Sequence, residues 1–228
     1  MGLTRKLKRL VRRDRPAPSP AATDAYLPNV TGVIHIGAHT GQESDQYLQH
    51  QLDVLWIEAN PNLMPSLQKT IRSRPQQQAI CYLVSDRDVE TVDFHVADNN
   101  GASSSIFQIA DHEKIWPKVG ISHMVQLASH TLPSIMKTEM INIDRFQCLS
   151  LDTQGSELKI LKGAEQILER FLFIKVEAAD FNSYQGGCTL SEIQDFLNSR
   201  GFAEIARHRF AHMPEVGSYF DVLFQNKS

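Results

Sequence analysis

Strand-like and helix-like segments alternate along this chain after its first thirty residues. Apolar runs at 30–37, 53–59 and 79–86 are separated by segments with helical periodicity at 42–50 and 61–73. Short apolar strands joined by helices are typical of βαβ units, which build a parallel sheet with helices on both faces. The alternation therefore predicts an α/β fold with a mostly parallel sheet.

The C-terminal half first extends this pattern and then changes it. A buried strand is expected at 146–152, an amphipathic helix at 156–171, a further strand at 172–178 and another helix at 190–202. The last two strand-like runs lie within 203–226 and are joined by a short connection, which favours antiparallel pairing. We therefore expect a C-terminal antiparallel hairpin beside the parallel strands.

The middle of the chain is less regular. One strand is expected at 91–98, a loop at 99–105, and short helices at 111–120 and 131–138. The segment 121–130 carries no assigned element. This region therefore predicts an insertion rather than another βα repeat.

Charge is distributed unevenly. Residues 1–15 contain seven Lys or Arg and one Asp, a net charge of +6, which leaves −9 for the remainder because the total is −3. An acidic body does not favour nucleic acid as a partner. The basic segment has two interpretations: a disordered leader, or a short amphipathic helix in weak contact with a membrane surface or a partner.

Domain boundaries follow from the segment rich in Pro and Ala at 16–28, which is typical of a linker. We expect residues 1–27 to form the basic tail and linker, and residues 28–228 to form one domain. No feature of the sequence indicates an oligomeric state.

The three cysteines are Cys81, Cys148 and Cys188, which are widely spaced and odd in number. This usage argues against a disulfide framework and a structural zinc site, and it favours a reducing compartment. A cytoplasmic location is therefore expected.

A glycine-containing turn follows the first expected strand, between Gly37 and Gly41. Backbone N–H groups of such a turn and of the helix after it can hold a nucleotide-like ligand. Glu58 closes the second strand about 20 residues later, where a carboxylate can accept hydrogen bonds from both ribose hydroxyls. The alternative role for Glu58 is a carboxylate that caps the following helix.

Other polar side chains also end expected strands. Ser85 and Asp86 end the third strand and can meet an adenine amino group, or can simply form a turn. Asp152 and Glu177 end adjacent strands, where they can share a proton or hold a divalent ion. Two carboxylates are too few to assign a metal, and none is expected.

Several blocks together resemble the FkbM family of S-adenosylmethionine-dependent methyltransferases. They are VIHIGAHTGQES (33–44), VLWIEANP (54–61), VSD (84–86), NGASSSIF (100–107), LSLDTQGSELKILKGA (149–164) and VEA (176–178). The resemblance implies a class I methyltransferase (Rossmann-like) fold, S-adenosylmethionine as donor, and O-methylation of a hydroxyl on a sugar, a glycan or a small secondary metabolite. The sequence departs from the family at His35, where many members carry an acid.

The resemblance and the strand ends together assign roles to residues. The cofactor-binding candidates are Gly37, Ala38, His39, Gly41, Glu58, Ala59, Ser85, Asp86 and Asp152. The acceptor-binding candidates are Ser103, Ser104, Gln154, Glu157 and Tyr184. Glu157 has an alternative role as an acid in the first turn of a helix.

Methyl transfer to a hydroxyl requires alignment and a group that takes the acceptor's proton. Asp152, Glu177 and His39 are the candidates for this base. Two alternative functions remain open. A nicotinamide oxidoreductase is disfavoured because the glycine spacing is Gly-x-x-x-Gly, and a non-catalytic nucleotide-binding domain is kept open by His35.

Overall fold

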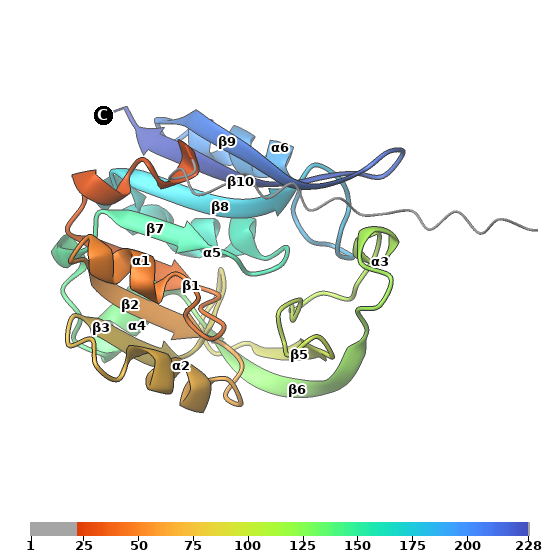
Figure 1. Cartoon of the computed structure of the whole chain (residues 1–228), viewed down its shortest axis with the longest axis horizontal. Helices are drawn as coiled ribbons and strands as arrows, with labels where there is room; N and C mark the ends of the chain where they lie inside the picture. Colours follow the sequence, from red (N-terminus) through yellow and green to blue (C-terminus); the bar gives the residue numbers. More distant parts are fainter. Residues whose placement is uncertain (1–21, 228) are drawn as a thin grey trace, which may run out of the picture.

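A seven-stranded sheet forms the centre of the molecule in the computed structural model, which describes residues 22–227 (Figure 1). In spatial order its strands are β3 (Gln77–Cys81), β2 (Asp53–Glu58), β1 (Gly32–Ile36), β7 (Cys148–Leu151), β8 (Phe173–Ala179), β10 (Gly217–Asn226) and β9 (Phe202–Met213). The first five are parallel, and β10 runs antiparallel to both β8 and β9. The predicted α/β fold with a C-terminal antiparallel hairpin is confirmed.

Helices cover both faces of this sheet, which explains why its central strands are apolar on both sides (Figure 1). On β1, Ile34 and Ile36 pack on one face and Val33 on the other. The first face is covered by α4 (Leu132–Thr138), α5 (Glu157–Gly163), the 3-10 helix η4 (Glu165–Arg170) and α6 (Leu190–Asn198). The second face is covered by η1 (Ala22–Asp24), η2 (Leu27–Asn29), α1 (Ser44–Gln49) and α2 (Met64–Ile71).

The strand order reverses between β1 and β7. From β1 the chain proceeds outward to β2 and β3, and it later returns to β7 on the other side of β1. In open α/β sheets, ligands bind beyond the carboxyl ends of the strands at such a reversal. The ends of β1, β2 and β7 are therefore where a ligand site is expected.

A second sheet, of three strands, lies beside the main one in the order β4 (Leu83–Val84), β6 (Ile121–His130) and β5 (Thr91–Ala97). The sequence analysis assigned no element to β6, because most of its side chains are solvent-exposed and show no clear apolar alternation. It also placed one strand at 79–86, whereas the chain leaves the main sheet after Cys81 and pairs with β6 instead.

The predicted helix at 156–171 is divided into α5 and η4. Gly163 ends α5 at a point where helix and strand come very close, since a Cβ on Gly163 would collide with the carbonyl oxygen of Ser85. Short helical elements complete the chain: α3 (His112–Ile115) and η3 (Ile143–Arg145). No helix within residues 22–227 has the length and apolar character needed to cross a bilayer.

Residues 22–27, which the sequence analysis placed in the linker, pack against the sheet. Tyr26 is buried with its ring centroid 6.2 Å from that of Phe173, and the Oδ1 atom of Asp24 lies 2.7 Å from Nζ of Lys175. The packed region therefore includes these residues. The basic tail, on which the expected membrane contact depends, lies outside the described residues.

Candidate functional site

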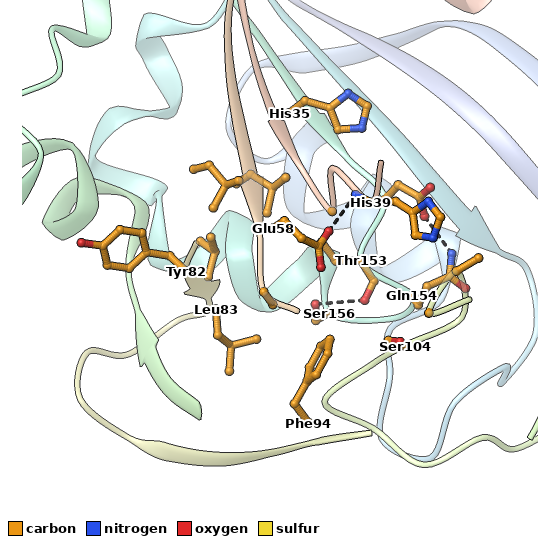
Figure 2. A pocket seen from close by; sticks show the side chains of 18 of the residues that line it. His35, His39, Glu58, Tyr82, Leu83, Phe94, Ser104, Thr153, Gln154 and Ser156 are labelled. Carbon is orange, nitrogen blue, oxygen red and sulfur yellow. Dashed lines mark hydrogen bonds between the residues drawn. The ribbon is translucent and has the colours of Figure 1, made fainter. Parts of the chain in front are cut away.

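A cavity lies beyond the carboxyl ends of β1, β2 and β7 (Figure 2). Its walls are formed by His35, Ile36, Gly37, His39, Gln42, Glu43, Ile57, Glu58, Ala59, Tyr82, Leu83, Val84, Phe94, Gly101, Ala102, Ser104, Ile106, Asp152, Thr153, Gln154 and Ser156. In the view of Figure 2, Leu83 and Phe94 lie below Glu58, and His39 and Gln154 lie to its right. The cavity thus has an apolar part and a polar part.

The turn after β1 is held tightly between the neighbouring strands. The carbonyl oxygen of Ile57 accepts the N–H groups of Gly37 and Ala38 at 3.0 and 3.2 Å. Gly37 has a φ of +84°, and a Cβ there would collide with the carbonyl oxygen of Asp152. Gly41 also has a positive φ, but it packs against Leu67 of α2 and does not line the cavity.

Replacement of Gly37 by Ala should therefore lower the free energy of unfolding by more than about 3 kcal/mol, because collision and backbone strain add. Gly186→Ala is the matched control: its φ is +80°, but the nearest neighbour of a Cβ would be Phe107 at 3.6 Å. The control should cost only about 1–2 kcal/mol. Urea unfolding of both variants measures the two free energies of unfolding. Equal losses of stability would contradict a collision between the new Cβ and the carbonyl oxygen of Asp152.

Glu58 is buried at the end of β2 and joins two backbone segments. Its Oε2 accepts the N–H of His39 at 2.7 Å, and its Oε1 accepts the N–H of Asn60 at 2.7 Å. Burial raises the pKa of Glu58, and these hydrogen bonds oppose that rise. The N–H of Asn62, ahead of the next helix, is accepted by the side chain of Asn60 and not by Glu58. Glu58 therefore does not have the capping role considered as its alternative, and it lines the cavity.

His39 links the turn to the connection after β5. Its Nε2 lies 2.8 Å from the carbonyl oxygen of Asn100, and because a carbonyl only accepts, Nε2 carries the hydrogen. Its Nδ1 then accepts from the amide of Gln42 at 3.1 Å. Both ring nitrogens are occupied in this arrangement, which makes His39 a tie between two loops rather than a free base.

Loss of this tie should be visible in solution. His39→Ala removes the contact with Asn100, so amide hydrogen exchange in residues 99–105 should become about tenfold faster or more. His95→Ala, on strand β5, serves as a control, because His95 is joined to Ser105 of this segment by backbone hydrogen bonds that the substitution keeps. Unchanged exchange in His39→Ala would show that the tie does not hold the loop.

The connection from β5 to β6 is fastened at a second place. Ile109 forms an isolated antiparallel bridge with Tyr184, and the N–H of Ala110 donates to the carbonyl oxygen of Ser183 at 3.0 Å. The same connection contains Ser103, which is buried, and Ser104, which lines the cavity and accepts the N–H of Ala97 at 3.1 Å. The connection therefore crosses from the turn after β1 to the loop after β8.

Ser85 and Asp86 do not line the cavity. Oγ of Ser85 donates to Asp86, and Asp86 forms an ion pair with Lys159 at 3.1 Å. Because β3 ends at Cys81, Ser85 and Asp86 lie beyond the cavity, and Leu83 lines its wall instead. Sequence reasoning missed Leu83 and Phe94, which belong to an apolar cluster that also contacts Ala59.

Gln154 connects two carboxyl groups at the polar end of the cavity. Its side-chain amide donates to Oδ1 of Asp152 at 2.7 Å and to Oε1 of Glu177 at 3.1 Å. Its amide oxygen accepts from the hydroxyl of Tyr184 at 2.8 Å. The structure thus brings together Asp152, Gln154, Glu177 and Tyr184. The closeness of Asp152 and Glu177 was expected from their positions at adjacent strand ends, whereas the bridge by Gln154 and Tyr184 was not.

Electrostatics at this cluster favour the protonated form of a carboxyl group. Burial, together with the negative charge of Glu157, raises the pKa of Asp152 to about 7. Burial and the charge of Asp152 raise the pKa of Glu177. Burial and mutual repulsion therefore favour a proton on this pair, and the pKa of about 7 puts the titration of Asp152 near neutral pH.

Two of the remaining candidates, Glu157 and Ala38, lie in the protein interior and do not line the cavity. Glu157 is buried and accepts the N–H groups of Thr153 and Gly155 at 2.8 and 3.0 Å, which is the helix N-terminal role considered as its alternative. Ala38 is buried in the core behind the turn, whereas Ala59 lines the cavity. No group of three or more His, Cys, Asp or Glu side chains in residues 22–227 is arranged to hold a metal ion.

Comparison with solved structures identifies the fold class. M. capricolum TrmK, solved with S-adenosylhomocysteine, aligns with a TM-score of 0.50 at 7% identity over 90% of this chain and 67% of its own. The METTL16 methyltransferase domain aligns with a TM-score of 0.51 at 10% identity over 87% of this chain and 61% of its own. At these identities the likeness concerns the fold alone, which is that of the class I S-adenosylmethionine-dependent methyltransferases.

Sequence comparison identifies the family. No curated protein sequence matches the chain significantly. The family profile described as the methyltransferase FkbM domain matches residues 35–203, which is most of the chain. The chain therefore belongs to the FkbM methyltransferase family, and S-adenosylmethionine is its methyl donor. Family membership sets the class as methyltransferase rather than nicotinamide oxidoreductase.

Proposed function

We propose that the protein transfers a methyl group to the oxygen of a hydroxyl on a sugar, a glycan or another small molecule. The observation that carries this proposal is the pair of Asp152 and Glu177, bridged by Gln154 at the end of the cavity. An alcohol must lose a proton as it is methylated, and a carboxylate with a pKa of about 7 can take it.

The residues of the cavity fit the donor. The expected cradle of free N–H groups is not formed by Gly37, Ala38 and His39, whose N–H groups are bonded within the protein. Gly37 still lines the cavity without a side chain, which leaves space for the methionine portion, and the carboxylate of Glu58 has lone pairs left for the two ribose hydroxyls. Leu83 and Phe94 offer apolar surface to the adenine ring. When bound, the donor supplies an electrophilic methyl group.

Only the reacting hydroxyl of the acceptor is proposed to reach the far side of Gln154, because the cavity there has a volume of only about 10 Å³. Its lining includes Glu157, Glu177, Tyr184 and Tyr219. Gln154 holds Asp152 and Glu177 in place, so that the acceptor oxygen and the proton-accepting oxygen are aligned before reaction. The connection containing Ser103 and Ser104 covers the site and excludes water.

Partners and location are proposed on physical grounds. The net charge of −9 outside residues 1–15 supports a small acceptor rather than nucleic acid. The three unpaired cysteines support a reducing compartment, the cytoplasm. The basic tail is proposed to make weak contact with an anionic membrane surface.

Transfer of radiolabelled methyl groups tests the function. Purified protein should label at least one member of a panel of glycans and hydroxylated metabolites, and it should not label RNA of similar mass. Label on RNA, or on nitrogen rather than oxygen, would overturn the proposed chemistry. Binding of S-adenosylhomocysteine without transfer to any acceptor would favour the non-catalytic alternative.

The pH dependence of transfer tests the base. Asp152 must be ionised to accept a proton, and its pKa of about 7 lies above its ordinary value. The ratio kcat/KM should therefore rise with pH and level off above the pKa of the pair. A flat profile from about pH 5 to about pH 8 would exclude this pair as the base.

A further inference from the structure

The donor's amino-acid portion carries an ammonium group that needs a negative partner, and this inference rests on the donor site proposed above. His35, at the end of β1, does not supply that charge. It is buried, its Nδ1 lies 3.0 Å from the hydroxyl of Tyr47, and burial lowers its pKa so that the ring is neutral. The negative partner must come from another element.

Glu43 lies at the right place. It follows the glycine turn directly before α1 and lines the donor cavity together with His35, Gly37 and Asp152. It also lines a second, polar cavity that extends behind Asp152. The side chain is half-buried, so its charge is only partly screened by water.

Glu43 feels the charge of Lys175 across the second cavity but forms no ion pair with it. Within the described part of the chain, its carboxylate has neither an ion pair nor a side-chain hydrogen bond. Lys175 is the lysine of the second cavity, and it already pairs with Asp24 at 2.7 Å. The cavity therefore presents a carboxylate that has no direct partner among the described residues to whatever binds beside Gly37.

We propose that Glu43 binds the ammonium group of the donor's amino-acid portion, in place of an acid at position 35. A carboxylate at this position attracts the ammonium and repels the neighbouring carboxylate of the ligand. Glu43 consequently orients the amino-acid portion, which in turn fixes the direction of the sulfur and its methyl group. It is a donor-specificity residue and not the base.

Calorimetric titration of the full chain with three probes tests this role. S-adenosylhomocysteine carries both the amine and the carboxylate, its decarboxylated analogue keeps only the amine, and 5′-methylthioadenosine lacks both. Glu43→Gln should weaken the first two by at least about tenfold and leave the third within about twofold. Glu169→Gln, an exposed residue on η4 at the opposite face, removes the same charge and should change none of them.

Each other outcome is decisive. Equal weakening of all three probes would show that Glu43 only shapes the turn, and weakening by Glu169→Gln would show a general charge effect; both overturn the proposal. Unchanged affinities in Glu43→Gln would overturn it as well. Failure of the unsubstituted protein to bind S-adenosylhomocysteine would instead overturn the donor site, and this inference with it.

Discussion

Replacement of Glu58 by alanine should abolish measurable binding of S-adenosylhomocysteine. The variant removes the proposed ribose contact and also frees two backbone N–H groups, those of His39 and Asn60. Hydrogen bonds to a charged group contribute about 1.5–3 kcal/mol each, so loss of both should lower the free energy of unfolding by about 3–6 kcal/mol. Calorimetry and urea unfolding measure the two effects separately.

The control for this variant lies on the same strand. Asp53 begins β2, at the end away from the cavity, and pairs with Arg145 on the surface. Asp53→Ala should lower stability by no more than about 1 kcal/mol and leave ligand affinity unchanged. Retained binding in Glu58→Ala would show that the assigned cavity does not hold the donor.

Asp152→Asn should stop transfer and stabilise the protein at the same time. Asparagine can still accept the hydrogen bond from Gln154, but it cannot take a proton, so kcat should fall by about 100-fold or more. The raised pKa of Asp152 means that the folded state holds its proton more tightly than the unfolded state. The contribution of Asp152 to stability is therefore most favourable below about pH 4 and is lost as pH rises to about 7.

The stability gain of Asp152→Asn should follow this dependence. Asparagine carries no charge, so the variant avoids the cost of burying an ionised carboxylate. It should gain about 1–3 kcal/mol in the free energy of unfolding near pH 8, with partial exposure taken into account, and progressively less towards pH 5. Urea unfolding across this range measures it. Asp195→Asn, an exposed acid on α6, should show no such trend. A loss of stability at about pH 8 in Asp152→Asn would contradict the repulsive environment.

The central sheet could be predicted from the sequence because its strands are buried on both faces. Such strands appear as continuous apolar runs, as in VIHIG, and they are hard to confuse with surface segments. β6 could not be predicted in this way, since most of its side chains face solvent and its partner β5 provides the evidence for it. Residues 22–27 were missed because their packing depends on β8, far along the chain.

The chemistry-bearing residues of the site could be predicted better than its walls. Gly37, Glu58 and Asp152 lie at strand ends and Glu177 lies near the end of β8, and adjacent parallel strands bring their ends together. Leu83 is an ordinary apolar residue, and nothing in its side chain indicates a binding role. It lines the cavity because the strand predicted at 79–86 breaks after Cys81, and the apolar pattern of the sequence does not show this break. Such apolar wall residues need the three-dimensional structure.

The two fastenings of the connection between β5 and β6 have a kinetic consequence. One end is held through the imidazole of His39 and the other through backbone bonds to Ser183 and Tyr184, so the turn after β1 and the loop after β8 are joined by one strap. A ligand that enters or leaves past this connection requires one of these attachments to open, so the opening frequency would set an upper limit on its exchange.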